Sequence, residues 1–308
     1  FHIKGNFDLN SRKVAKYSQI SVLIALFVHI IQRNVNSLGA LSQQIPGERV
    51  SLLSGNPIPF SFVMLGVSIF CLIDWKNLDT KRAIYAFTFF LIGCYFACFL
   101  SGTRSTLLAA LLITPILVFY LPKKRFASLL GILIFPSIIF VIMYFHYTGM
   151  RSFSYLDHIE RGLRTLFLAD DAEISVRLRL EMWSAAYQAI IESPLFGYSI
   201  IERFHAILPY LPKGFVVTFS HPHNDILAAF ISAGVFGGVF AFLSLLTPML
   251  AAFLAHDWKY EKIYFGVMIT CTALVTSSFS TVYFNDISAA WLAFSAYLIW
   301  ALDFGKVK

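Results

Sequence analysis

Long runs of apolar residues alternate with short polar segments along this chain. The runs lie near residues 17–31, 57–73, 83–100, 105–121, 127–147, 226–255, 263–282 and 288–303. Several of them reach the roughly 18–20 residues that a helix needs to cross the hydrocarbon of a bilayer. The pattern therefore predicts an all-α integral membrane protein, a multi-span helical bundle with about eight spans, two of which are short enough to be tilted, merged or re-entrant.

The spacing of these runs divides the chain into three parts. We expect an N-terminal transmembrane bundle of five spans at 1–147, a periplasmic loop domain with an amphipathic helix at 148–222, and a C-terminal bundle of three spans at 223–308. The chain starts at Phe1 and shows no basic and apolar regions of a signal peptide, so we expect it to begin inside a longer protein.

Composition agrees with a membrane protein, since the chain is 58% hydrophobic, 17% aromatic and only 13% charged. These values exclude ordinary soluble and disordered classes. The four cysteines all lie in predicted spans, which indicates neither a disulfide framework nor a thiolate metal site. They are Cys71, Cys94, Cys98 and Cys271.

Lysine and arginine in the short loops predict the orientation. With the PKKR segment at 122–125 in the cytoplasm, the cytoplasmic segments hold 14 basic residues and the short outer loops hold three, namely Arg33, Arg49 and Arg104. Both ends of this chain are then cytoplasmic, and the 148–222 segment is periplasmic. The net charge of +7 reflects this bias, so nucleic acid is not an expected partner.

Arg104 lies in the segment SGTRSTLLAA, between two apolar runs on the predicted outer side. One interpretation is an arginine that extends to the lipid headgroups. The alternative is a cation held at the membrane boundary to receive an anion, because its neighbours are small and offer additional hydrogen-bond donors.

Helical spacing of apolar residues predicts an amphipathic helix within the outer segment, starting near Ser175 as its N-cap and ending before Pro194 and Gly197. The apolar positions are Val176, Leu180, Trp183, Tyr187 and Ile190. Arg177 shares a face with Glu181, which favours a solvated ion pair. Arg179 flanks the apolar stripe and is the better candidate for a site at the membrane surface.

Two histidines precede a long apolar run in the stretch HPHNDILAAFISAGVFGG at 221–238. Pro222 disfavours helix for His221, so a helix is expected to begin at His223 or Asn224 and to run to about residue 255. The positive end of the helix dipole favours neutral imidazole, which accepts a proton. The alternatives are interfacial histidines bonded to loop carbonyls and simple polar capping.

Gly234 and Gly238 have the GxxxG spacing, which predicts close packing of this helix against a neighbouring helix. A metal site is the weaker interpretation of the polar residues nearby, because neither candidate group has a well-defined ligand spacing. The two groups are His221, His223 and Asp225, and Asp170, Asp171 and Glu173.

These residues resemble the O-antigen ligase and polymerase superfamily. Its signature is a histidine, then Asn, Ser or Gln, nine residues and Gly-x-x-Gly, which His223, Asn224, DILAAFISA and the stretch from Gly234 to Gly237 match. Arg104 matches the family's arginine just outside a span.

Two further elements extend the resemblance over about residues 83–240. Arg179 in RLEMW matches a loop arginine four residues before an aromatic, and Pro194, Leu195 and Gly197 match a P-L-x-G turn. The resemblance implies a GT-C-like bundle, and since family members have more spans, it also implies that an N-terminal portion is missing.

The resemblance implies an inner-membrane glycosyltransferase that moves a glycan from undecaprenyl diphosphate to an acceptor at the periplasmic face. In ligases the acceptor is the lipid A core of lipopolysaccharide. It implies His223 as the catalytic base and Arg104 and Arg179 as diphosphate ligands, with no metal and no cofactor required and with inversion at the transferred sugar. Secondary candidates are Arg177, His221 and Asn224, and the structural glycines are Gly234, Gly237 and Gly238.

Other functions remain open from the sequence. O-antigen polymerases and protein O-oligosaccharyltransferases use the same donor, and the single dominant outer segment favours a ligase. A transporter or flippase of lipid-linked sugars is the alternative from another class. It is disfavoured because ionisable residues gather at the outer ends of the spans and are almost absent from their middles.

Overall fold

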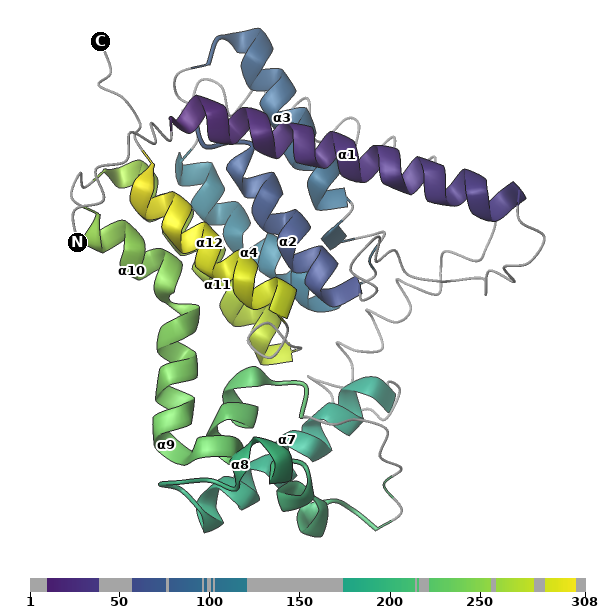
Figure 1. Ribbon diagram of the computed structural model, residues 1–308, viewed down its shortest axis with the longest axis vertical. Coiled ribbons are helices and arrows are strands. Elements are labelled where there is room, and N and C mark those ends of the chain that lie inside the picture. Colours follow the sequence, from purple (N-terminus) through teal and green to yellow (C-terminus); the bar gives the residue numbers. More distant parts are fainter. Residues whose placement is uncertain are drawn as a thin grey trace. The chain divides into compact units, whose positions relative to one another are not determined.

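The computed structural model describes the residues that form the helices and their immediate flanks. These residues are 10–38, 57–75, 78–95, 97–98, 101, 103–120, 174–213, 215, 222–255, 259–279 and 286–302. Nearly all of them are helical, and no β-strand occurs within these ranges (Figure 1). The chain forms two compact units, the first built from residues 1–122, 245–276 and 282–308 and the second from 123–244 and 277–281.

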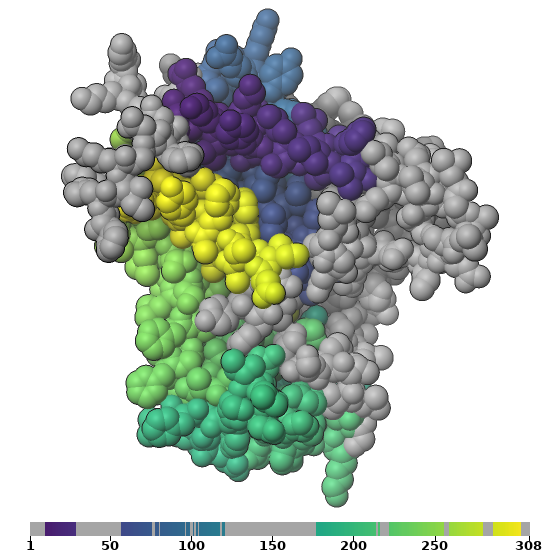
Figure 2. Space-filling view, in the orientation of Figure 1, coloured from purple at the N-terminus to yellow at the C-terminus, as the bar shows by residue number. Residues whose placement is uncertain are grey.

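Helices cover every predicted span that falls within the described residues, and the predicted span at 127–147 falls outside them. The first unit contains α1 (Ser11–Leu38), α2 (Pro57–Phe70), α3 (Thr80–Tyr95), α4 (Arg104–Tyr120), α10 (Thr247–Leu254), most of α11 (Tyr260–Phe279) and α12 (Asp286–Ala301). One face of α1 is buried through Val14 and Val22, whereas Tyr17 and Phe27 are exposed. Helices α1 and α12 occupy one visible face of this unit (Figure 2, purple and yellow).

The core of the first unit surrounds α2, which is apolar on all sides and almost completely buried, as expected for a helix without a polar face. Phe70 packs against Phe265 of α11 and edge-on against Trp291 of α12. Gly66 allows α12 to approach, because a Cβ atom there would lie 2.5 Å from Trp291 Nε1.

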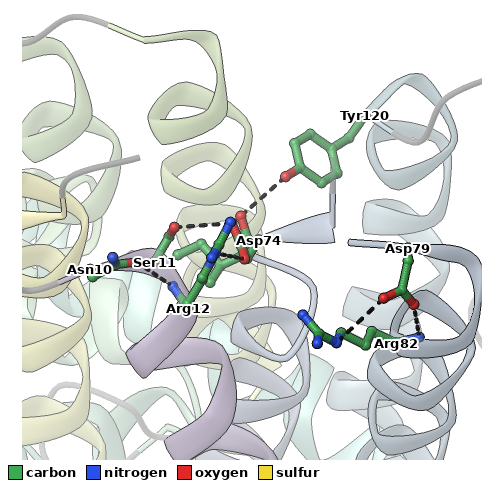
Figure 3. Close-up of polar contacts among 8 residues, drawn as sticks. Asn10, Ser11, Arg12, Asp74, Asp79, Arg82 and Tyr120 are labelled. Atoms are coloured by element: carbon green, nitrogen blue, oxygen red, sulfur yellow. Dashed lines mark hydrogen bonds and ion pairs between the residues drawn. The ribbon is translucent and has the colours of Figure 1, made fainter. Parts of the chain in front are cut away.

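One end of this unit holds a polar group that we call the Asp74 cluster, formed by Ser11, Arg12 and Asp74 (Figure 3). The Asp74 carboxylate is 2% exposed, accepts a hydrogen bond from Ser11 Oγ at 3.2 Å, and lies 3.4 Å from Arg12 Nε. Tyr120 OH donates to the carbonyl of Ile73 at 3.3 Å. The start of α1 and the ends of α2 and α4 therefore meet.

The opposite ends of α2 and α4 also meet. Thr103 Oγ1 donates to the Pro57 carbonyl at 3.5 Å, and the hydroxyls of Ser61 and Thr106 lie 2.7 Å apart. The two helices therefore run parallel, as the predicted topology requires of the spans at 57–73 and 105–121, because one predicted span lies between them in the chain.

The second unit contains α7 (Ile174–Glu192), α8 (Ser199–Glu202), the 3₁₀ helix η4 (His205–Tyr210) and α9 (Asp225–Leu245). Its core joins three of these elements. The fully buried members are Ala185, Ala186 and Ala189 of α7, Ile207 of η4 and Ile231 of α9.

The predicted amphipathic helix exists as α7, but two details of the prediction are wrong. Ser175 lies inside the first turn, so it is not the N-cap. The buried face consists of Met182 and the three alanines, whereas Leu180 and Tyr187 of the predicted apolar stripe are exposed. Alanine is favoured on the packed face because it lets η4 and α9 approach the helix closely.

Among the residues that the structure describes, two helices, α9 and α11, have the length and composition of a membrane span. Shorter apolar helices lie at Pro57–Phe70, Ser105–Leu117 and Asp286–Ala301. The number of spans and the domain boundaries at 147/148 and 222/223 stay predictions.

Candidate functional site

His223 is held between two anchored residues immediately before α9. On one side, Trp183 Nε1 of α7 donates to the Pro222 carbonyl at 2.9 Å. On the other, Asn224 caps α9, because its Oδ1 accepts from Leu227 N at 3.0 Å and its carbonyl accepts from Ala228 N at 2.9 Å. His223 connects them with φ +52°, a left-handed conformation that few side chains adopt without support.

The capping alternative is therefore confirmed for Asn224, and α9 begins at Asp225, one residue later than the sequence pattern indicates. Capping by Asn224 and a chemical role for His223 are compatible, because the cap defines where the imidazole emerges. His221 lies outside the described residues.

Arg179 lies one helical turn before Trp183 on α7, so both side chains extend from the same face of the helix. The ring of Trp183 is also fixed by Phe279, whose centroid lies 5.6 Å away. The sequence spacing that places an arginine four residues before an aromatic thus brings Arg179 toward the loop that Trp183 holds.

The positive charge of Arg179 affects the protonation of His223. The pKa of His223 is lowered from its usual 6.5 to about 4, first by burial of the imidazole and then by the positive charge of Arg179. The Nδ1 atom of His223 and the Nε atom of Arg179 are both shielded from solvent. The imidazole is consequently neutral at physiological pH, as the position at a helix N-terminus predicts, but burial and Arg179 are the causes.

Arg177 points elsewhere. Its Nε lies 3.8 Å from Glu181 Oε1 in an i,i+4 ion pair on a partly exposed face of α7. The predicted solvated ion pair is confirmed, and of the two arginines in RLRLEMW it is Arg179 whose charge acts on His223.

Sequence reasoning missed a second charged pair beside this site. Asp225, the first residue of α9, is fully buried. Burial lowers the pKa of Arg203, and the negative charge of Asp225 offsets part of that shift. Arg203 follows α8 and precedes Phe204 and Ile207, which belong to the same apolar cluster as Leu227 and Ile231 of α9. Only the fold that places η4 and α9 in one cluster reveals this pair. The one signal in the sequence is an aspartate directly before a long apolar run.

The P-L-x-G turn and the glycine signature meet at a kink in α9. Ala233 and Gly234 leave helical geometry, with Gly234 at φ +60° and ψ −153°. Two backbone hydrogen bonds attach the turn to the kink, from Val235 N to the Pro194 carbonyl at 2.8 Å and from Tyr198 N to the Ile231 carbonyl at 2.7 Å.

Glycine is required on both sides of this contact. Gly197 has φ +66°, and a Cβ atom there would lie 2.7 Å from Ala233 N. A Cβ atom at Gly234 would overlap the Leu195 carbonyl and lie 2.6 Å from Phe196 N. Two elements that the sequence presents as separate motifs therefore form one backbone junction.

The bend at this junction is sharp (Figure 1). Residues eight positions apart in a straight α-helix are separated by about 12 Å along the axis. Here a Cβ atom at Gly237 would lie 2.6 Å from the Ala229 carbonyl oxygen, and one at Gly238 would overlap the ring of Phe230. The two halves of α9 thus fold against each other.

The predicted use of Gly234 and Gly238 in packing against a neighbouring helix is wrong. Gly234 contacts the turn at 194–197, and Gly238 contacts Phe230 of its own helix. The continuous helix predicted to residue 255 is also interrupted, because α9 kinks at Gly234 and ends at Leu245, and α10 begins at Thr247.

Arg104 begins α4 in the first unit, and its side chain lies outside the described part of the chain. The acidic residues of the alternative metal site, Asp170, Asp171 and Glu173, also lie outside it. Within the described residues, no group of three or more His, Cys, Asp or Glu side chains is arranged to hold a metal ion.

Comparison with known proteins gives one result that bears on this site. A family model described as O-antigen ligase matches residues 86–243, just over half of the chain, and this range includes Arg104, Arg179, His223 and the Gly234 junction. No curated protein matches the chain.

Proposed function

The chain belongs to the O-antigen ligase family, and we propose that it joins a polyprenyl-diphosphate-linked O-antigen glycan to the lipid A core of lipopolysaccharide. The family is embedded in bacterial membranes and performs glycosyl transfer of the O-antigen ligase or polymerase type. The observation on which the specific proposal rests is the neutral imidazole of His223 beside the guanidinium of Arg179.

This pair supplies the two groups that transfer from a diphosphate carrier requires. The acceptor hydroxyl must lose its proton as it attacks, and the leaving diphosphate must have its growing negative charge offset. A neutral imidazole accepts the proton, and a guanidinium offers paired N–H donors that suit phosphate oxygens.

The proposed step is a single displacement. The acceptor oxygen attacks the anomeric carbon while His223 takes its proton, and the bond from that carbon to the diphosphate oxygen breaks with its electron pair on the diphosphate. Because Nδ1 of His223 is buried, we expect Nε2 to receive the proton. Attack from the face opposite the leaving group inverts the transferred sugar.

Arg104 and Arg179 are the proposed ligands of the diphosphate. The family position of Arg104, just outside a span, suits a carrier whose polyprenyl tail stays in hydrocarbon while its diphosphate lies at the interface. With two arginines on the diphosphate, the proposed reaction needs no metal ion.

We propose that the site faces the periplasm across the inner membrane. The support is the excess of basic residues in the short loops that are predicted to be cytoplasmic. In that orientation the 148–222 segment, which holds α7, and the start of α9 lie on the side where lipopolysaccharide is completed.

Reconstitution of the full-length protein in lipid vesicles tests this function. The protein receives a polyprenyl-diphosphate-linked glycan and lipid A core, and the products are separated by mass. A species that joins glycan to lipid A core supports the ligase. Longer carrier-linked glycans without that species identify a polymerase, glycan on an added acceptor protein identifies an oligosaccharyltransferase, and movement of donor across the bilayer without a new covalent product identifies a transporter.

A further inference from the structure

Four large apolar side chains are exposed within seven residues of the second unit. Leu195 and Phe196 of the turn are 55% and 78% exposed, and Ile200 and Ile201 of α8 are 65% and 83% exposed. We call these four residues the turn patch. Exposure of several large apolar side chains so close together in the chain is unfavourable in water and marks a surface that meets another apolar phase.

The turn patch continues the apolar surface of α9. The hydrogen bond from Val235 N to the Pro194 carbonyl attaches the turn directly to the kink. Beyond the kink, α9 exposes large apolar side chains and no charged ones. These are Val235, Phe236, Val239, Phe240, Phe242 and Leu243.

The environment of α9 changes at the kink. Before it, Ala228, Ala229, Ile231 and Ser232 are buried in the second unit. After it, the helix as far as Leu245 shows the exposed apolar side chains expected of a surface in contact with lipid. The kink therefore marks the level at which the chain enters hydrocarbon.

We propose that the turn patch inserts into the acyl chains of the membrane leaflet on the His223 side and anchors the Arg179–His223 pair at the level of the donor diphosphate. Lipid is the partner because the patch is apolar, lies at the entry level of α9 and adjoins its lipid-facing residues. Amphipathic elements at an interface bind lipid in this way, with apolar side chains at the boundary of headgroups and acyl chains.

The backbone junction transmits this anchoring to the site. The turn holds the kink through two hydrogen bonds and the close contact at Gly197 and Gly234. Asn224 caps the first half of α9. This half therefore keeps a fixed depth in the membrane relative to the inserted side chains. The inference rests on the proposed function only for the identity of the donor.

Depth-dependent quenching of introduced tryptophans tests the proposal. Phe196→Trp, Ile201→Trp and the control Gln188→Trp, an exposed position on α7, are each compared with the parent protein in phosphatidylethanolamine and phosphatidylglycerol vesicles. Leu195→Trp and Ile200→Trp provide a second pair if a variant of the first does not fold. We expect the additional fluorescence at 196 and 201 to be quenched by lipids brominated on the acyl chains and protected from acrylamide, with the reverse at 188.

Two results would overturn the proposal. In the first, acrylamide quenches the tryptophans at 196 and 201 as strongly as the one at 188. In the second, bromolipid quenching appears only after polyprenyl diphosphate is added, which identifies a binding site for the carrier instead of a lipid anchor. Since quenching is measured without glycosyl transfer, failure of the anchor and failure of the proposed function are separate results.

Discussion

Two arginines of this protein have opposite kinds of neighbour. Arg12 in the Asp74 cluster lies 3.4 Å from a buried carboxylate that also accepts a hydrogen bond from Ser11. Arg179 acts on a half-buried imidazole, and its charge helps to keep that imidazole neutral. Arg12 pairs with the carboxylate of Asp74, whereas Arg179 makes protonation of His223 less favourable.

The difference separates a structural role from a chemical one. The Asp74 cluster joins the start of α1 to the end of α2, so its favourable charges stabilise the folded state. A cation beside a base disfavours protonation of that base, and it favours the binding of an anion such as a diphosphate. The comparison therefore predicts that changes at the first cluster affect stability and that changes at the second affect transfer.

Replacement of His223 by alanine should have the largest effect. Removal of the base should lower the transfer rate by about 10²–10⁴-fold, the usual contribution of general base catalysis. Binding of the carrier-linked donor should persist, because arginines hold the diphosphate. The rate is measured with purified variants in vesicles and donor binding by equilibrium sedimentation of the vesicles.

His221→Ala is the matched control, since only His223 precedes the Asn224 cap. It should retain substantial activity, and EDTA should change neither variant. A parental transfer rate in His223→Ala would exclude His223 as the base. Loss of activity in EDTA that a divalent ion restores would revive the metal interpretation of His221, His223 and Asp225.

Arg179→Lys should lower transfer by about tenfold to a hundredfold despite the retained charge. A charge-assisted hydrogen bond contributes about 1.5–3 kcal/mol, and each 1.4 kcal/mol corresponds to a factor of ten in rate. Lysine cannot reproduce the paired donors of the guanidinium.

Arg177→Lys is the control two residues away, and it should change the rate by no more than about twofold because its ion pair with Glu181 is partly exposed. Both variants are compared in the same vesicle transfer assay. If Arg177 is essential and Arg179 tolerates alanine, the assignment of the two arginines is reversed.

Asp74→Asn should have the smallest effect on transfer and a measurable effect on stability. The change weakens an ion pair whose arginine is 69% exposed and a buried hydrogen bond from Ser11, so we expect the free energy of unfolding to fall by about 1–2 kcal/mol. Denaturant unfolding in detergent measures the loss. A reduced transfer rate per folded molecule would show that the Asp74 cluster is more than structural.

The sequence predicted the helices and most of the local chemistry. Apolar runs placed α2, α4, α11 and α12 within a few residues, because a helix that crosses hydrocarbon must satisfy its own backbone hydrogen bonds. The i,i+4 spacing of Arg177 and Glu181 also predicted their ion pair. These features depend on residues close together in the chain.

Features that depend on distant residues were missed. The kink at Gly234 is held by the turn at 194–197, some forty residues earlier, and an apolar run with glycines reads equally well as a continuous span. The pair of Arg203 and Asp225 requires η4 to pack on α9. The buried face of α7 was misjudged because hydropathy favours large apolar residues, while close packing selected alanine.

The titration of His223 tests the central claim most directly, namely that Arg179 and burial keep this imidazole neutral. Isotope-labelled histidine is followed by nuclear magnetic resonance in lipid nanodiscs, and His223→Gln identifies the signal. Because the lowered pKa of about 4 favours the neutral form above that value, the signal should stay close to that of neutral imidazole between pH 8 and pH 5. In Arg179→Gln the midpoint should rise toward the usual 6.5. A midpoint at or above 6.5 in the parent protein, unchanged in Arg179→Gln, would contradict the account.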